Sequence, residues 1–162
     1  MKRLPWKYTA GLFDGEGCVK YGIRRKSARP GQGKTAGALR DVYYPQVVLE
    51  LTLSEPGFPV IDMLHNSYGG RVYHRESKNP NWKDTRLWRV ADKGKCRLIA
   101  NNIVKHTYIK REQLRLALWV WDNLKGIQPH SVALALRDEF SALKGDPHRL
   151  SEKAQVRLLE ML

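Results

Sequence analysis

The chain has 162 residues and a mass of 18.7 kDa, the size of one ordinary domain, and its 42% of hydrophobic residues is typical of a globular protein. No apolar run approaches the roughly 20 residues that a membrane helix needs, and the first residues lack the apolar stretch of a secretory signal. Two cysteines are too few for a disulfide scaffold or a zinc knuckle. We therefore expect one intracellular domain over residues 1–162, with no membrane partner.

The net charge of +13 is confined to the first two thirds of the chain. Up to Arg111 there are 22 Lys and Arg against 9 Asp and Glu, whereas from Glu112 onward there are 7 of each. A field of this sign attracts polyanions, and neutralised phosphates release counterions, which gives salt-dependent affinity. A nucleic acid is therefore the expected partner, and charge alone leaves open a structural RNA-binding protein of the ribosomal kind.

Hydrophobic periodicity predicts the order helix, hairpin, helix, hairpin and then further helices. The expected elements are a helix over 5–14 that Gly15 and Gly17 end, a strand over 18–27, a loop over 29–34, a strand over 43–53, a helix over about 54–68, strands over 71–76 and 86–91, and helices from 94 onward, including 131–143 and 151–162. Two hairpins can form one antiparallel sheet. The helices would cover its apolar face and leave the other face open.

The open face of this sheet is expected to be polar and basic because side chains alternate along a strand. On the first two strands it would carry Lys20, Arg24, Lys26, Tyr44, Gln46 and Glu50. Arg and Lys suit guanine in the DNA major groove, Gln suits adenine, and Glu accepts from the cytosine amino group. His74 and Arg89 on the second hairpin are further candidate contacts. The same alternation also fits an ordinary solvated sheet face.

The segment Thr9 to Gly17 (TAGLFDGEG) breaks a local rule of helix chemistry. Asp14 and Glu16 stand at the carboxyl end of the first helix, where the backbone is already partly negative, and each is misplaced by roughly 0.3–1 kcal/mol. Residues that break such rules often belong to a functional site. A bound divalent cation would reverse the local field and make these oxygens favourable ligands.

This segment resembles the LAGLIDADG motif of homing endonucleases, in the variant A-G-[LF]-[FIV]-D-G-[DE]-G. The resemblance covers about residues 4–125 and implies an α+β fold with an αββαββα core and a four-stranded antiparallel saddle sheet. Residues 126–162 would form a tail of additional C-terminal helices within the same single endonuclease domain.

The resemblance also implies roles for individual residues. Glu16 stands at the catalytic, metal-binding carboxylate, the carbonyl of Gly15 at a second metal ligand, and Asp14 at the supporting acidic position. Lys110, in the stretch Lys110 to Gln113, matches a basic residue at the edge of the active site. The family's polar residue near the end of the second strand falls at Leu53 or Ser54, and Leu53 cannot position a water. Simpler alternatives are a capping Asp14 and a solvated Lys110.

Assembly and activity follow from the same resemblance. One motif per chain supplies one acidic cluster, so a twofold homodimer would pack two motif helices through Ala10, Gly11, Phe13 and Asp14. The expected activity is Mg²⁺-dependent, site-specific double-strand cleavage of a long pseudo-palindromic DNA target, with Mn²⁺ or Ca²⁺ able to occupy the site and no small-molecule cofactor. Such enzymes act on DNA in a prokaryotic or phage-infected cytoplasm or in an organelle. The alternative is a non-cleaving binder of the same fold, either an RNA maturase or a DNA-binding regulator.

Overall fold

A computed structural model describes residues 3–26, 42–146 and 149–162 of the chain. Its elements are α1 (Trp6–Glu16), β1 (Gly17–Lys26), β2 (Val42–Ser54), α2 (Phe58–Tyr68), β3 (Arg71–Arg75), β4 (Thr85–Val90), α3 (Lys93–Ile103), the 3-10 turn η1 (Val104–His106), α4 (Arg111–Asn123), α5 (His130–Gly145) and α6 (Ser151–Leu159). The predicted order of helices and hairpins is confirmed. The predicted loop over 29–34 lies outside the described residues.

The four strands form one antiparallel sheet in the order β1-β2-β4-β3, so the two hairpins pair through β2 and β4. Glu50 of β2 lies opposite both Cys18 of β1 and Arg89 of β4, and Arg89 lies opposite Arg71 of β3. Residues that face one another across neighbouring strands share a face of the sheet. This register therefore assigns each strand residue to one of the two faces.

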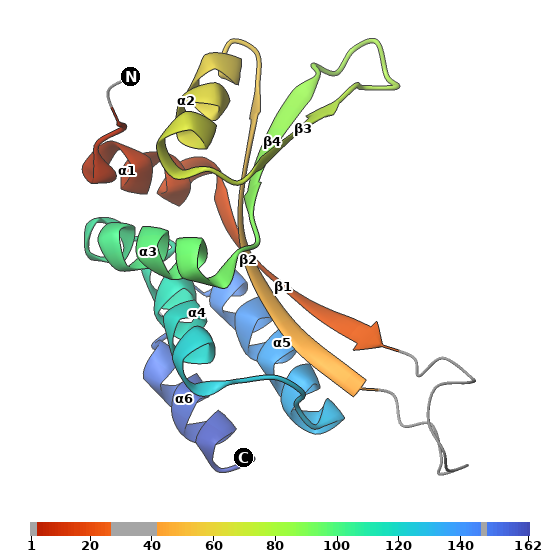
Figure 1. Cartoon of the computed structure of the whole chain (residues 1–162), viewed down its shortest axis with the longest axis vertical. Helices are drawn as coiled ribbons and strands as arrows, with labels where there is room; N and C mark the ends of the chain where they lie inside the picture. Colours follow the sequence, from red (N-terminus) through yellow and green to blue (C-terminus); the bar gives the residue numbers. More distant parts are fainter. Residues whose placement is uncertain (1–2, 27–41, 147–148) are drawn as a thin grey trace.

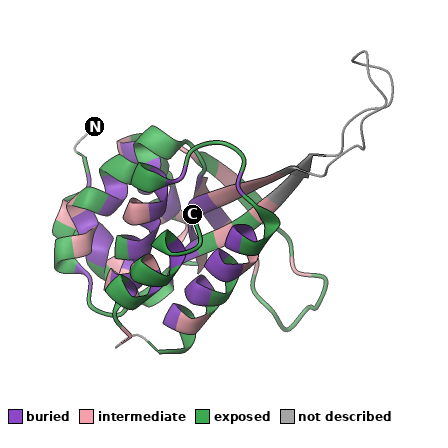
Figure 2. Ribbon diagram, turned by 90° about the horizontal axis from the view of Figure 1, so that it is seen from below, coloured by how far each residue is buried: buried purple, intermediate pink, exposed green. Residues whose placement is uncertain are grey.

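The helices lie on one side of the sheet and leave its other, concave side uncovered (Figure 1). Leu49 and Leu51 of β2 and Trp88 of β4 point into the helical layer, where each is at most 1% exposed. Figure 2 shows the buried residues of the helices on the sides that face this core. The predicted α+β fold with an apolar, helix-covered face and an open face is thus confirmed.

The first helix continues past its predicted end. Gly15 and Glu16 are helical, and α1 ends at Glu16, with Gly17 as the C-cap, whose N–H donates to the carbonyl of Phe13. Gly15 does not stop the helix because its φ is not positive; the described glycines with positive φ are Gly69, Gly70 and Gly126. Glu16 is therefore the last residue of α1 and directly precedes Gly17, the first residue of β1.

The last helices belong to the same core as the rest of the chain. Phe140 of α5 stacks on Tyr21 of β1 with 5.5 Å between ring centroids. Buried Glu139 pairs with Arg149 at 2.7 Å and with Arg157 of α6 at 3.1 Å, which holds α6 to α5. Helix α5 therefore packs against β1 and β2 from the helical side, and α6 packs on α5 and α4.

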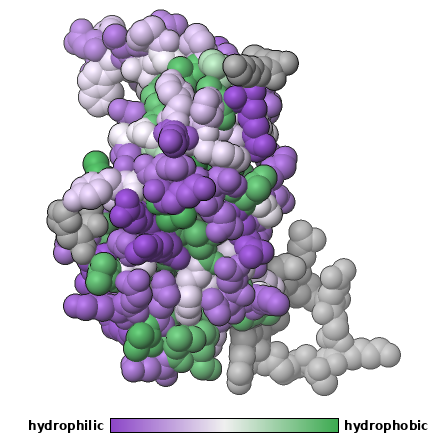
Figure 3. Space-filling view, turned by 90° about the vertical axis from the view of Figure 1, so that its left-hand side faces the viewer, coloured by the Kyte–Doolittle hydropathy of each residue, from purple (hydrophilic) through white to green (hydrophobic). Residues whose placement is uncertain are grey.

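The surface over the helices is hydrophilic across most of its area, with apolar residues in small groups (Figure 3). None of the helices in the ranges that the structure describes is both long enough and apolar enough to cross a lipid bilayer.

Candidate catalytic centre and nucleic-acid interface

Asp14 joins the end of α1 to the segment that leads into α4. Its Oδ1 accepts from the backbone N–H of Lys110 at 2.8 Å, and its Oδ2 accepts from the backbone N–H of Tyr108. A carboxylate that accepts from two backbone amides is held in one orientation. Asp14 therefore fixes Lys110, the residue before α4, beside the end of the motif helix.

Glu16 is placed differently from Asp14, although it stands only two residues away. It is exposed, and within the described part of the chain it makes no hydrogen bond or ion pair. Space around Gly15 is open, and its carbonyl belongs to the last turn of α1, where backbone oxygens lack helical partners. The two acids of the motif thus differ: Asp14 accepts hydrogen bonds from two backbone amides, whereas Glu16 has no partner among the described residues.

The Glu16 carboxylate and the Gly15 carbonyl at the end of α1 are oxygen ligands of the kind that a hard divalent cation prefers, but they are too few to bind one alone. No group of three or more His, Cys, Asp or Glu side chains that could hold a metal occurs among the described residues. Mg²⁺ is commonly held by one or two carboxylates together with water and substrate phosphates. Glu16 and the Gly15 carbonyl match the protein share of such a site, and the remaining ligands would come from a nucleic acid or a second protomer.

The end of β2 supplies no obvious group to orient a water molecule. Leu53 is half-buried against the core, on the helix-covered face, and Ser54 is exposed at the last position of the strand. The structure therefore leaves Ser54 as the polar candidate of the two.

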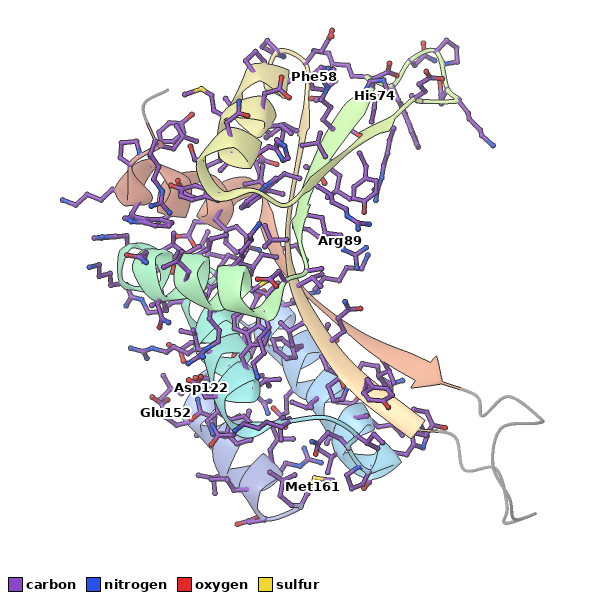
Figure 4. The ribbon with its side chains drawn as sticks, in the orientation of Figure 1. Phe58, His74, Arg89, Asp122, Glu152 and Met161 are labelled. Carbon is purple, nitrogen blue, oxygen red and sulfur yellow. The ribbon has the colours of Figure 1, made fainter. Side chains whose placement is uncertain are left out.

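The open face of the sheet gathers part of the predicted DNA-contact set. Lys20, Tyr44, Gln46, Glu50 and Arg89 occupy positions of β1, β2 and β4 that share this face by register. Figure 4 shows Arg89 on the side of the sheet away from the helices. Arg24 and Lys26 continue β1, where they pair with Tyr44 and Val42, and their side chains lie outside the described residues.

Glu50 does not have the free carboxylate that a base-reading role would need. It is only 8% exposed and lies between two cations, with Lys20 Nζ at 3.6 Å and Arg89 Nε at 3.3 Å. Glu50 Oε1 and Arg89 Nε are both buried without a hydrogen bond. A buried carboxylate between two cations holds their heads in place, so Glu50 organises the basic face.

Two residues of the open face were missed by the sequence analysis. Arg71 and Tyr73 of β3 lie opposite Arg89 and Leu87 and are exposed on this face. They help to line a hollow of about 500 Å³ together with Gln46, Gly70, Arg89, Val90, Ala91, Asp92 and Lys95. The alternation within the segment RVYHR could have revealed them. Side chains alternate along a strand, so if Val72 and His74 lie on the helix-covered face, Arg71 and Tyr73 lie on the open face.

His74 lies apart from the other predicted contacts. Its ring meets the ring of Phe58 in α2 edge-on, with 5.9 Å between centroids, on the helix-covered face (Figure 4). Its Nε2 is 3.6 Å from Asp84 Oδ2. The structure therefore separates His74 from the open face that carries Arg89.

The predicted dimer contacts divide into two groups. Ala10 and Phe13 are 0% exposed inside the protomer's own core, and the Asp14 carboxylate accepts from the backbone of Tyr108 and Lys110. Gly11 is exposed, and a Cβ added there would meet nothing within 4 Å. Tyr8, Gly11 and Gly15 are exposed at helical spacing and lie on the free side of α1.

Comparisons with known proteins bear on the fold. No family model matches the chain, and no curated protein matches it in sequence. The solved structure of the homing endonuclease I-CvuI with its target in the presence of Ca matches with a TM-score of 0.58 and 19% identity, over 96% of this chain and 92% of that one. I-TnaI matches with a TM-score of 0.54 and 15% identity over 99% of both chains.

Two further solved structures of homing endonucleases match at similarly low sequence identity. I-Vdi141I, an archaeal intron-encoded homing endonuclease complexed with DNA, matches with a TM-score of 0.55 and 16% identity, over 96% of this chain and 94% of that one. I-SmaMI bound to uncleaved DNA with calcium matches with a TM-score of 0.53 and 18% identity, but this chain covers only 49% of it. The chain therefore has the fold of the LAGLIDADG homing endonucleases, as the motif predicted.

Proposed function

We propose that this protein is a site-specific DNA endonuclease of the LAGLIDADG type, which binds duplex DNA on the open face of its sheet and hydrolyses phosphodiester bonds beside Glu16. The observation that carries the proposal is the division of roles within the motif. Asp14 is occupied by the backbone N–H groups of Tyr108 and Lys110, whereas Glu16 is exposed and unpaired in the described part of the chain. The motif therefore keeps a free carboxylate at the edge of a basic surface.

Each group has a distinct task in this proposal. Glu16 and the Gly15 carbonyl would hold Mg²⁺, which supplies charge relief on the phosphate and an activated water when bound. Asp14 positions the Lys110 backbone, and the Lys110 ammonium offers positive charge to the phosphate near the cleaved bond. Lys20, Gln46, Arg71, Tyr73 and Arg89 would contact DNA along the sheet, with Glu50 keeping Lys20 and Arg89 in position.

A homodimer completes the proposal because one chain supplies one motif. The free side of α1 includes Gly11, and the neighbouring Tyr108 and Ile109 are 69% and 47% exposed. Exposed apolar groups beside the two exposed glycines of α1, Gly11 and Gly15, favour close association with a second copy. The 49% coverage of I-SmaMI gives independent support, because two copies of this chain would match one chain of that protein.

Cleavage of a plasmid library with Mg²⁺ or with EDTA tests this function, and Glu16→Gln is the decisive variant. We expect the wild-type protein to linearise plasmids that contain its site only with the metal. Glu16→Gln should retain binding and lose cleavage by about a hundredfold or more, the usual scale for losing a principal catalytic group.

Asp14→Asn is the matched control because it makes the same chemical change two residues away. It should lower the stability of the protein, since it weakens the two backbone hydrogen bonds at Tyr108 and Lys110, whereas Glu16→Gln should leave stability unchanged. Normal cleavage by Glu16→Gln would refute the catalytic assignment. Specific binding without cleavage by the wild-type protein would instead favour the non-cleaving binder, the alternative to which Leu53 lends support.

A further inference from the structure

Arg111, the first residue of α4, is bound close to the end of the motif helix. The segment before it is attached to α1, because the backbone N–H groups of Tyr108 and Lys110 donate to the Asp14 carboxylate. Arg111 directly follows Lys110, so the Cα atoms of these two residues are about 3.8 Å apart. The start of α4 is therefore fixed to the same helix end that carries Glu16.

Two contacts turn the Arg111 side chain back toward this segment. Its Nε donates to the carbonyl of Thr107 at 2.9 Å, and its guanidinium carbon lies 6.0 Å from the centre of the Tyr108 ring. Thr107 is only 1% exposed, and its own N–H donates to the carbonyl of Ile103. A buried residue of the segment that contacts α1 therefore holds the guanidinium in place.

The terminal nitrogens of Arg111 are free, unlike those of the arginines around it. Five other arginines occur from residue 93 onward, and each pairs with a carboxylate: Arg97, Arg115, Arg137, Arg149 and Arg157. Arg111 forms no ion pair with any Asp or Glu in the described ranges. Thr107 takes one of its five N–H donors. The other four form a planar fork that fits two oxygens of a phosphate.

The charge of Arg111 is unfavourable where it stands. Arg111 lies in the first turn of α4, where the backbone is partly positive, and Lys110 before it is also a cation. Residues 104–111 contain three Lys or Arg and no Asp or Glu. An anion that approaches this helix end would relieve the repulsion. A phosphate beside Glu16 is an anion of this kind.

Arg111 is better prepared than Lys110 to meet such a phosphate. Only the backbone of Lys110 is bound, since its ammonium group makes no hydrogen bond or ion pair with the residues that the structure describes. The guanidinium of Arg111 is itself held, by Thr107 and by the Tyr108 ring. A charge that is already oriented stabilises a transition state without reorganisation during the reaction.

We propose that Arg111 is a catalytic residue, whose two terminal nitrogens bind the phosphate that is cleaved beside Glu16. This role rests on the proposed function. In the reaction, a water oxygen forms a new bond to phosphorus and the water loses a proton to solvent. The bond from phosphorus to one sugar oxygen breaks, and this oxygen gains a proton. Arg111 exchanges no proton, and its N–H groups offset the negative charge on the other phosphate oxygens.

Arg111→Gln removes the charge without removing the local hydrogen bond. Glutamine has an amide N–H that can donate to the Thr107 carbonyl, but it has neither the charge nor the fork. We expect single-turnover cleavage of the selected target with Mg²⁺ to slow by about a hundredfold, the scale for loss of one oriented donor. Affinity for the target in EDTA should fall far less, with a salt dependence weaker by about one unit of slope. The Tm should stay at the wild-type value.

Chemical rescue gives a readout that a purely structural role would not change. Arg111→Ala leaves space beside Tyr108 that a free guanidinium ion can enter. Millimolar guanidinium chloride should therefore restore part of the lost cleavage rate, and the same concentration of sodium chloride should not. Arg137→Ala is the matched control, because Arg137 is exposed on α5 and pairs with Asp138. It should cleave like the wild type, with or without guanidinium.

The outcomes separate the role of Arg111 from the function on which it rests. Wild-type cleavage rates in Arg111→Gln overturn the role, while loss of cleavage in Glu16→Gln would still support the proposed function. A loss in Arg111→Ala that guanidinium does not restore, or that a lower Tm accompanies, indicates a structural clamp and also overturns the role. Failure of the wild-type protein to cleave any duplex refutes the proposed function, and the role of Arg111 with it.

Discussion

Replacement of Gly11 by leucine is expected to stabilise the protomer and to weaken the proposed dimer. Gly11 lies inside α1, where glycine is a poor helix former, and a Cβ there meets nothing within 4 Å. Leucine at such a position favours the helix by roughly 0.8 kcal/mol relative to glycine. For a chain of this length, that corresponds to a rise in Tm of about 2–4 °C.

The same substitution acts in the opposite direction on the proposed interface. Two copies of Gly11 would face one another across a twofold axis, so each dimer receives two leucine side chains. Forcing extra bulk into a packed contact costs about 1–3 kcal/mol per site, or at least about 2 kcal/mol per dimer. The dimer should therefore weaken by roughly thirtyfold or more.

Sedimentation equilibrium over a range of protein concentrations measures the association, and thermal unfolding of the dissociated protomer measures its stability. Gly145→Leu is the matched control, since Gly145 ends α5 and also has open space around its Cβ. It should leave the association unchanged. A Gly11→Leu protein that remains as dimeric as the wild type would refute the packing of α1 against its twin.

Two further predictions follow from the buried groups of the sheet and of α3. Glu50→Gln should lower the free energy of unfolding, measured in urea, by about 1–2 kcal/mol. This value lies between those of exposed and buried ion pairs, because Lys20 and Arg89 are themselves partly exposed. An unchanged unfolding midpoint would contradict the positioning role of Glu50. Burial raises the pKa of Cys96 to about 11, so the folded state keeps the thiol protonated above the pH at which the unfolded chain loses this proton. Stability should therefore fall by up to about 1.4 kcal/mol per pH unit between roughly pH 8.5 and 11. The slope should be smaller in Cys96→Ala, and equal slopes in the two proteins would contradict this linkage.

The motif and the alternation of polar and apolar residues were sufficient to predict the architecture. Short-range periodicity determines which residues can line a strand or a helix face, and β2 shows it plainly, with Val47, Leu49 and Leu51 all buried. Such local patterns identify elements and their order. The resemblance of residues 9–17 to a known motif then predicted the fold that those elements build.

Tertiary structure decided which of the candidate residues are available for chemistry. The sequence shows Asp14 and Glu16 two residues apart at the end of one helix. Only the tertiary structure brings the segment before α4 against α1, where its backbone N–H groups donate to Asp14 and leave Glu16 without a partner. Likewise, the spacing of Ala10 and Phe13 did not reveal that this side of α1 faces the protomer's own core. Periodicity defines faces of a helix or a strand, whereas the partner of each face is set by contacts between segments far apart in the chain.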